Sequence, residues 1–287
     1  MVMLHVKTAD EKNQFLFETQ TSVSVADLRN ELVQIHNLRL KALQLCDACR
    51  GLAAHGPLRP EATRGLTEEV AKLSDLDVYA DGQPTNPDPT GYRNGVAPPP
   101  QAAKVLEETA DSSSEALSYK KVLMNQPLTL RQVKAAFENL RGAVMISYPA
   151  YYKLPEWDPA RVILEEEEQQ KDESAIVTDI LNPQKTSLWW AGKELSGNEL
   201  LSFYVGRNEK TKIIARLQPK GAGAPIREPR IDAETHKAML AYCHRKRQEA
   251  EKAEEDDDDS YLNSAWANPR ALKNMLIGGG REIKWKP

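Results

Sequence analysis

The feature that most constrains the fold of this 287-residue chain is a run of three short segments in its second half. They read LWWAGKEL at residues 188–195, LSFY at 201–204 and KIIARL at 212–217. Apolar residues dominate the first and last segments, and an Ala-Gly-Lys step of the kind found in tight turns follows the two Trp residues. The pattern predicts an apolar strand, a turn, a second turn around the Leu-Ser-x-Tyr segment, and a closing strand.

This order of elements resembles the second half of ubiquitin, and the resemblance implies a β-grasp fold that recognises other proteins. In ubiquitin and its relatives, partners dock on the face formed by the third and fifth strands. The resemblance places Trp189 outward on the third strand, with Leu188 and Trp190 alternating around it. Trp is favoured at binding hot spots, but Trp is also highly buried on average. The alternative is therefore that both Trp side chains are buried under the N-terminal region or the C-terminal helix.

The N-terminus shows a second candidate for β-grasp strands. Residues 2–7 and 14–19 read as two short strands, and Ser24 is placed to cap a helix with an apolar stripe that begins at Val25. Strand, turn, strand and helix is the opening of a β-grasp. The same pattern also fits a plain ββα unit that packs on another part of the chain.

Two arrangements can complete the β-grasp. In the local arrangement, residues 142–218 form the whole domain, with added strands at 143–148 and 162–164. In the other arrangement, the N-terminal hairpin pairs with the strands in 188–217, and a long insertion separates the two parts. We favour the local arrangement because elements that follow one another in sequence usually neighbour one another in space.

The expected fold class is α+β, with a ubiquitin-like β-grasp domain, an N-terminal ββα and helical region, and an extended helical C-terminal tail. The capping box Thr129-Leu130-Arg131-Gln132 predicts the start of a helix. The expected divisions are 1–79 (ββα and helices), 80–101 (Pro/Gly-rich linker), 102–141 (helical segment), 142–218 (β-grasp) and 219–287 (C-terminal helix, acidic run and docking tail).

The overall charge and the apolar runs exclude several classes of function. The net charge is -4, whereas proteins that bind nucleic acids usually carry a basic excess, so we expect no nucleic-acid partner. No window reaches the ~18 apolar residues of a membrane span, so we expect no membrane insertion. Three cysteines imply no disulfide framework, which indicates a soluble protein of a reducing compartment.

Candidate catalytic or metal-binding motifs are incomplete. Cys46 and Cys49 with His55 nearby offer three zinc ligands, but structural zinc sites normally have four, so we expect core cysteines in a helix. The segment 206–211 ends in Lys-Thr like a phosphate loop but lacks the Gly directly before the Lys. We therefore expect no catalytic residues, no metal, no cofactor and no small-molecule substrate.

Several blocks of sequence resemble the Kurly family of cilia- and flagella-associated proteins. These blocks are LRGAVMI at 140–146, YVGRNEKTKIIA at 204–215, YLNSAW at 261–266, and IKW at 283–285. The opening residues MVMLHVK are similar too. The blocks are long and occur in the family's order, whereas residues 77–125 carry no such resemblance.

The resemblance implies a non-enzymatic adaptor for the assembly of axonemal outer dynein arms, with a role in cilium positioning. The alternative is a resident structural subunit of the axoneme or basal body. The implied partners are other dynein-arm assembly factors and axonemal dynein subunits, and the implied locations are the cytoplasm, the cilium or flagellum, and the basal body. The candidate partner-binding residues are Trp189, Trp190, Tyr204, Lys212, Tyr261, Trp266 and Trp285.

Overall fold

A computed structural model describes residues 1–8, 13–66, 84–169, 176–177, 179–225, 233–256 and 270. The chain divides into two units, Met1–Ile226 and Arg227–Pro287. In the second unit, helix α8 (Ala233–Asp256) carries exposed apolar side chains near its start, at Met239, Leu240 and Tyr242.

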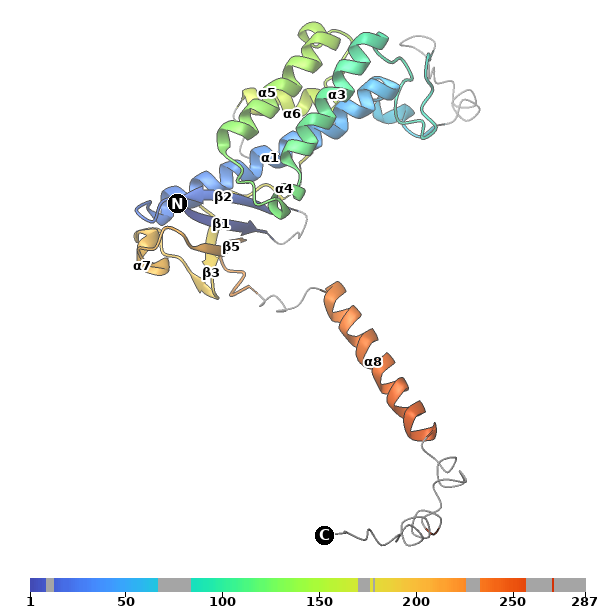
Figure 1. The fold of residues 1–287 in the computed structure, drawn as a ribbon. Coiled ribbons are helices and arrows are strands. Elements are labelled where there is room, and N and C mark those ends of the chain that lie inside the picture. The colour runs from blue at the N-terminus through green and yellow to red at the C-terminus, as the bar shows by residue number, and fades with distance from the viewer. Residues whose placement is uncertain are drawn as a thin grey trace, which may run out of the picture. The chain divides into compact units, whose positions relative to one another are not determined.

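The first unit is built on one five-stranded mixed sheet (Figure 1). Its strands are β1 (Val2–Lys7), β2 (Phe15–Thr19), β3 (Thr186–Trp190), β4 (Lys193–Glu194) and β5 (Lys212–Pro219). The order across the sheet is β2-β1-β5-β3-β4. The central pair β1–β5 is parallel, and the other three pairs are antiparallel. The two halves of the chain therefore meet in the middle of the sheet.

One long helix joins the sheet to a helical layer. Helix α1 (Val25–His55) is capped by Ser24, whose Oγ accepts a hydrogen bond from the Asp27 backbone N–H at 3.1 Å. Its buried residues belong to the same core cluster as the alternating apolar side chains of β1 and β5. At 31 residues, the helix extends well beyond the sheet, because each residue adds about 1.5 Å.

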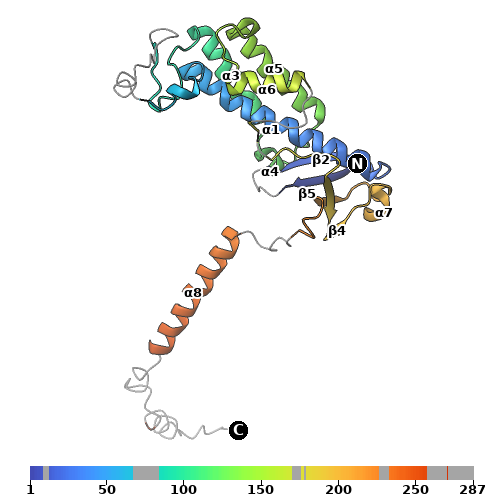
Figure 2. The same cartoon turned by 180° about the vertical axis from the view of Figure 1, so that it is seen from behind.

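The far part of α1 packs against a layer of three helices (Figure 2). These are α3 (Pro100–Leu117), α5 (Leu130–Ser147) and α6 (Pro159–Glu168). Shorter elements are α4 (Lys120–Leu123), which contacts β2, α7 (Leu201–Val205), and the 3-10 turns η1 (Glu61–Thr63) and η2 (Pro149–Tyr151). Among the helices described, none is both long and apolar enough to cross a membrane.

The strands predicted at 143–148 and 162–164 are wrong, because both segments are helical. The capping box at Thr129 is confirmed, and α5 runs from Leu130 through the whole apolar run. Its buried residues Val133, Phe137, Leu140 and Val144 follow helical spacing, which leaves Ile146 63% exposed. At α6, the Asp158 side chain caps the helix and Pro159 takes its first position, where a missing N–H is tolerated.

The preference for a sheet made only from residues 142–218 is also wrong. The N-terminal hairpin supplies β1 and β2, and β1 pairs in parallel with β5. The rule that sequential elements are neighbours fails here because α1 is long enough to pack against both the sheet and the helical layer. Helices α3, α5 and α6, which lie between α1 and β3 in the sequence, form the helical layer, and β3 then joins the sheet between β5 and β4. The fold class with both helices and strands is confirmed at the level of a mixed α/β protein.

The described part of the predicted 80–101 linker folds back onto the end of α1. The last carbonyl groups of a helix have no partner inside the helix. Here Asn86 Nδ2 donates to the Ala54 carbonyl at 2.7 Å, and the Gly95 N–H donates to the His55 carbonyl at 2.9 Å. Gly56 ends α1 with a φ of 72°, and a Cβ at this position would overlap the Val96 carbonyl. The Pro/Gly-rich segment thus supplies hydrogen-bond donors to carbonyl groups in the last turn of α1.

Candidate functional site

The face of the sheet that points away from α1 is the principal candidate site. We call it the outer sheet face and define it by Met3, His5, Lys7, Trp189, Lys212, Ile214 and Arg216. These residues alternate along their strands with the buried core residues. On β2, Leu16 also points outward, opposite His5, but it is buried. The Leu128 N–H donates to the Leu16 carbonyl at 2.7 Å, so the chain that leads into α5 covers this edge.

Ile214 lies at the centre of the outer sheet face. Its side chain is 51% exposed, although β5 is the middle strand of the sheet. His5 is its partner in register on β1, and Lys212 and Arg216 lie two residues to either side on β5. An exposed Ile on a central strand presents apolar area that a partner can bury. Sequence reasoning did not select Ile214, although its outward register, opposite to Ile213, was the available signal.

The two tryptophans of β3 lie on opposite faces of the sheet. Trp189 is half-buried on the outer sheet face opposite Arg216, and its Nε1 donates to Ser187 Oγ at 3.0 Å. Trp190 is partly buried and packs against the core cluster, and the fully buried Leu188 belongs to that cluster. The outward placement of Trp189 follows the alternation expected for a strand. Trp190 belongs to the core side and adds little to the outer surface.

The remaining predicted residues take different places. Tyr204 lies on α7, and its hydroxyl oxygen accepts the Ser196 N–H at 2.9 Å. Its neighbour Phe203 stacks edge-on against it and is 72% exposed, so Phe203 offers more surface than Tyr204. Lys212 Nζ donates to Asn125 Oδ1 at 2.7 Å, which ties β5 to the chain after α4. The last three candidates lie outside the described residues: Tyr261, Trp266 and Trp285.

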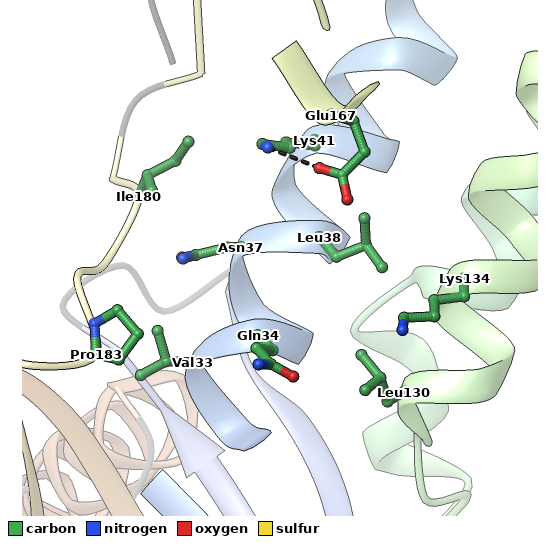
Figure 3. A pocket seen from close by; sticks show the side chains of 10 residues that line it. All are labelled: Val33, Gln34, Asn37, Leu38, Lys41, Leu130, Lys134, Glu167, Ile180 and Pro183. Carbon is green, nitrogen blue, oxygen red and sulfur yellow. Dashed lines mark hydrogen bonds and ion pairs between the residues drawn. The ribbon is translucent and has the colours of Figure 1, made fainter. Parts of the chain in front are cut away.

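A pocket of about 370 Å³ opens between α1, α5 and the chain that leads to β3 (Figure 3). Val33 and Leu38 of α1 give it apolar walls, and Ile180 lies across from them. At one end, Lys41 Nζ and Glu167 Oε2 form an ion pair at 2.7 Å. Gln34, Asn37 and Lys134 also line the pocket, so its walls are partly apolar and partly polar.

The cysteines considered as zinc ligands are core residues of α1. Cys46 and Cys49 are fully buried, and burial raises the pKa of the Cys46 thiol to about 12 and that of Cys49 further. A metal-binding thiolate needs the opposite shift. Within the described ranges, no three His, Cys, Asp or Glu side chains are grouped to hold a metal ion. The third cysteine, Cys243, is exposed on α8.

Other buried ionisable groups connect elements of the fold. His36 of α1 is 1% exposed, and burial lowers its pKa to about 4. Arg39 Nε donates to the Leu117 carbonyl at 2.8 Å, which joins α1 to α3. Asp158 is fully buried, burial raises its pKa, and it accepts the N–H groups of Leu58 and Ala160 at 3.0 Å. These contacts hold the helical layer on α1.

The geometry thus defines a mixed α/β protein with one exposed sheet face as its candidate interface. A sequence model described as "Cilia- and flagella-associated protein 298" matches residues 186–281, a range that begins at β3. Proteins of that name are similar over their full length: 42% identity for the 298-A protein of Xenopus laevis and 41% for that of Homo sapiens, each covering 100% of both chains. The Drosophila melanogaster protein is 35% identical over 97% of both chains.

The chain belongs to the cilia- and flagella-associated protein 298 family. This finding confirms the resemblance to the Kurly family that the sequence blocks carried. No solved structure matches the chain.

Proposed function

We propose that this chain is a non-enzymatic adaptor of motile cilia and flagella that acts in the assembly of axonemal outer dynein arms. Its relatives are named for association with cilia and flagella, and their full-length similarity supports a role in the same organelle. Its partners in this proposal are other dynein-arm assembly factors and axonemal dynein subunits. It would work in the cytoplasm, at the basal body and in the cilium.

We also propose that the sheet and the first part of α1 form a ubiquitin-like β-grasp. The strand order, the central parallel pair β1–β5 and a helix on one face support this assignment. The helical layer between α1 and β3 is then a large insertion into the β-grasp. In this arrangement the insertion leaves the outer sheet face available over β1, β5 and β3.

The observation that carries the proposal is the exposed Ile214 at the centre of the outer sheet face. Its half-exposed side chain would contribute about 1 kcal/mol if a partner buried it, since full burial of such a side chain is worth about 1.5–3 kcal/mol. Trp189 lies beside it and has the size and rigidity typical of an interface anchor. Together they form an apolar centre that is large enough to seat a partner.

The test replaces the cell's own relative in ciliated cells with the full chain or with Ile214→Ser. We expect Ile214→Ser to lose outer dynein arms and the association with assembly factors, at an unchanged melting temperature. The matched control is Ile146→Ser, because Ile146 is 63% exposed on α5, away from the sheet. If both variants restore dynein arms equally well, the outer sheet face is not the working surface.

Helix α8 supports a second candidate function, a resident structural subunit of the axoneme or basal body. Its exposed Met239, Leu240 and Tyr242 would suit attachment of a long helix to a filament. Salt extraction and stoichiometry separate the two functions. An assembly factor is soluble and substoichiometric to dynein, whereas a structural subunit stays with the axoneme at a fixed ratio.

A further inference from the structure

The pocket between α1, α5 and the chain that leads to β3 has walls that other contacts hold in place (Figure 3). On one side, the Asn37 side chain of α1 makes two hydrogen bonds with the backbone of Leu181, at 2.7 and 2.9 Å. At one end, the ion pair between Lys41 and Glu167 joins α1 to α6 at 2.7 Å. The pocket is therefore formed before a ligand binds, which lowers the cost of ordering it.

Apolar surface lies on both sides of α1 in this pocket. Val33, Ile180 and Pro183 lie on the side of the chain that leads to β3, and Leu38 and Leu130 lie on the side of α5 (Figure 3). An α-helix with its side chains is about 10 Å across, so the two apolar areas are about 10 Å apart. In an extended chain, two side chains three positions apart span this distance, at about 3.3 Å per residue.

Two polar side chains of the pocket are available to a ligand. Gln34 and Lys134 are exposed, and neither side chain has a hydrogen bond or ion pair within the described ranges. Lys41 and Glu167 already pair with each other, so Lys134 carries the unpaired charge among the ten lining residues. The lining thus favours a carboxylate next to Lys134, while the Gln34 amide can donate to a peptide carbonyl.

Two carboxylates near the pocket limit how acidic this ligand can be. Glu31 precedes Gln34 by three residues on α1, and Glu138 follows Lys134 by four residues on α5. Both are exposed and neither lines the pocket. A run of several acidic residues would be repelled by them. The site therefore fits a single carboxylate beside apolar side chains better than an acidic stretch.

The shape of the pocket favours a protein segment over a small molecule. Pockets for small molecules usually bury about 70–90% of the ligand surface. This pocket is open to solvent along one side, so a small carboxylate would leave much of its surface in water. A protein chain can continue beyond the pocket and place only a few side chains in its volume of about 370 Å³.

We propose that this pocket binds an extended segment of a partner protein with two apolar residues three positions apart, one of them next to Asp or Glu. One apolar side chain packs on Leu38 and Leu130, the other packs on Ile180 and Pro183, and the carboxylate pairs with Lys134. The pocket lies on α1 and the helical layer, whereas the outer sheet face points away from α1. The inference therefore goes beyond the proposed function and does not depend on it.

The test measures fluorescence anisotropy of labelled peptides on the full chain. The probes are Ser-Ser-Leu-Ser-Ser-Leu-Glu-Ser-Ser and the same sequence reversed, which allows for either chain direction. One control peptide has Lys in place of Glu, and another has Ser in place of both Leu. We expect the tighter Glu peptide to bind at least about threefold better than its Lys version, since exposed ion pairs are weak. It should bind at least about tenfold better than its version without Leu.

Variants with matched controls locate the binding. Lys134→Glu should reverse the charge preference, so that the Lys peptide binds more tightly than the Glu peptide. Gln34→Tyr should fill the pocket and weaken the Glu peptide about fivefold or more. Lys104→Glu, exposed on α3, and Gln44→Tyr, exposed on α1 outside the pocket, should leave both affinities unchanged. Thermal melts of all four variants exclude unfolding as the cause.

Equal binding of the Glu and Lys peptides, or a preference for Glu that persists in Lys134→Glu, would overturn the inference. So would equal loss in Gln34→Tyr and Gln44→Tyr. Octanoate that binds more tightly than the peptide and displaces it would assign the pocket to a small carboxylate instead. Ile214→Ser should bind the Glu peptide as wild type does, and a loss there would place the binding on the outer sheet face. Since Ile214→Ser in ciliated cells tests the proposed function, either proposal can fail while the other stands.

Discussion

His36 makes the stability of the first unit depend on pH in the mildly acidic range. Its side chain is 1% exposed on α1, and its Nε2 is 3.3 Å from the Asp179 carbonyl oxygen. Its Nδ1 is buried, with no hydrogen-bond partner among the described residues. Burial lowers the pKa from 6.5 to about 4, because the imidazolium would lose its hydration.

The direction of the effect follows from the lowered pKa. The unfolded chain takes up a proton near pH 6.5, whereas the folded chain does so only near pH 4. The stability that neutral His36 contributes is therefore complete above pH 6.5 and is lost as the pH falls towards 4. The whole difference is worth about 3 kcal/mol, at about 1.4 kcal/mol per pKa unit. Between about pH 7 and about pH 5, about 2 kcal/mol of it is lost.

Urea unfolding at these two pH values measures the loss. Wild type also loses stability through its carboxylates, so the informative quantity is the difference between wild type and His36→Gln. Gln does not titrate, and its amide can still donate to the Asp179 carbonyl. We expect His36→Gln to lose about 2 kcal/mol less than wild type between the two pH values. His244→Gln, exposed on α8, is the control and should behave as wild type.

Equal pH dependence of wild type and His36→Gln would refute the burial of His36. It would also contradict the contact between His36 of α1 and the Asp179 carbonyl in the chain before β3. Asn37 holds the same chain through two hydrogen bonds with Leu181, at 2.7 and 2.9 Å.

Three further predictions concern stability and reactivity. Asp158→Ala should destabilise the fold by about 3–5 kcal/mol in urea unfolding, because two backbone N–H groups lose a buried acceptor and the half-buried Arg93 loses its ion-pair partner. Ala191→Asn should stabilise it by about 0.5–1 kcal/mol, since Ala191 has a φ of 49° in the β3–β4 turn and Asn tolerates that conformation. A thiol reagent should label Cys243 rapidly in the native chain, but Cys46 and Cys49 only after unfolding.

Each of these predictions has its own control. Thr129→Ala removes an exposed helix cap and should cost only about 1 kcal/mol, so an equal effect of Asp158→Ala would contradict the buried acceptor. Gly192→Ala, in the same turn at a φ of 79°, should destabilise where Ala191→Asn stabilises. Fast native labelling of Cys46, or tightly bound zinc that blocks it, would contradict a core role for that thiol.

Local elements could be predicted from the sequence where their pattern was unambiguous. Ser24 and Thr129 marked helix starts, and the alternation in residues 2–7 and 212–217 marked strands. The run at 143–148 was wrongly assigned to a strand, since a short apolar run fits a buried strand and a helix equally well. The apolar stripe of the preceding helical residues continues into this run at helical spacing, and only this continuation identifies the run as helix.

The pairing of strands that lie far apart in the sequence could not be predicted from the sequence. No local signal states that β1 lies beside β5, because parallel pairing depends on how the long α1 and the helical layer return the chain. For the same reason, the sequence did not identify Ile214 as a candidate site residue. Its outward register was readable from the alternation of β5, but its central position appears only when β1 pairs on one side and β3 on the other. Trp189 could be placed on the outer side because the resemblance to ubiquitin put it there, with Leu188 and Trp190 alternating around it.

Site-specific photo-crosslinking tests most directly whether the outer sheet face is the contact surface of a ciliary adaptor. The full chain would carry p-benzoylphenylalanine in place of Ile214 or, as a control, in place of Ile146, and would be irradiated in ciliated cells. The account predicts adducts with a dynein-arm assembly factor or dynein subunit from Ile214 and none from Ile146. The same adducts from both positions, or none from Ile214 in cells that build dynein arms, would contradict it.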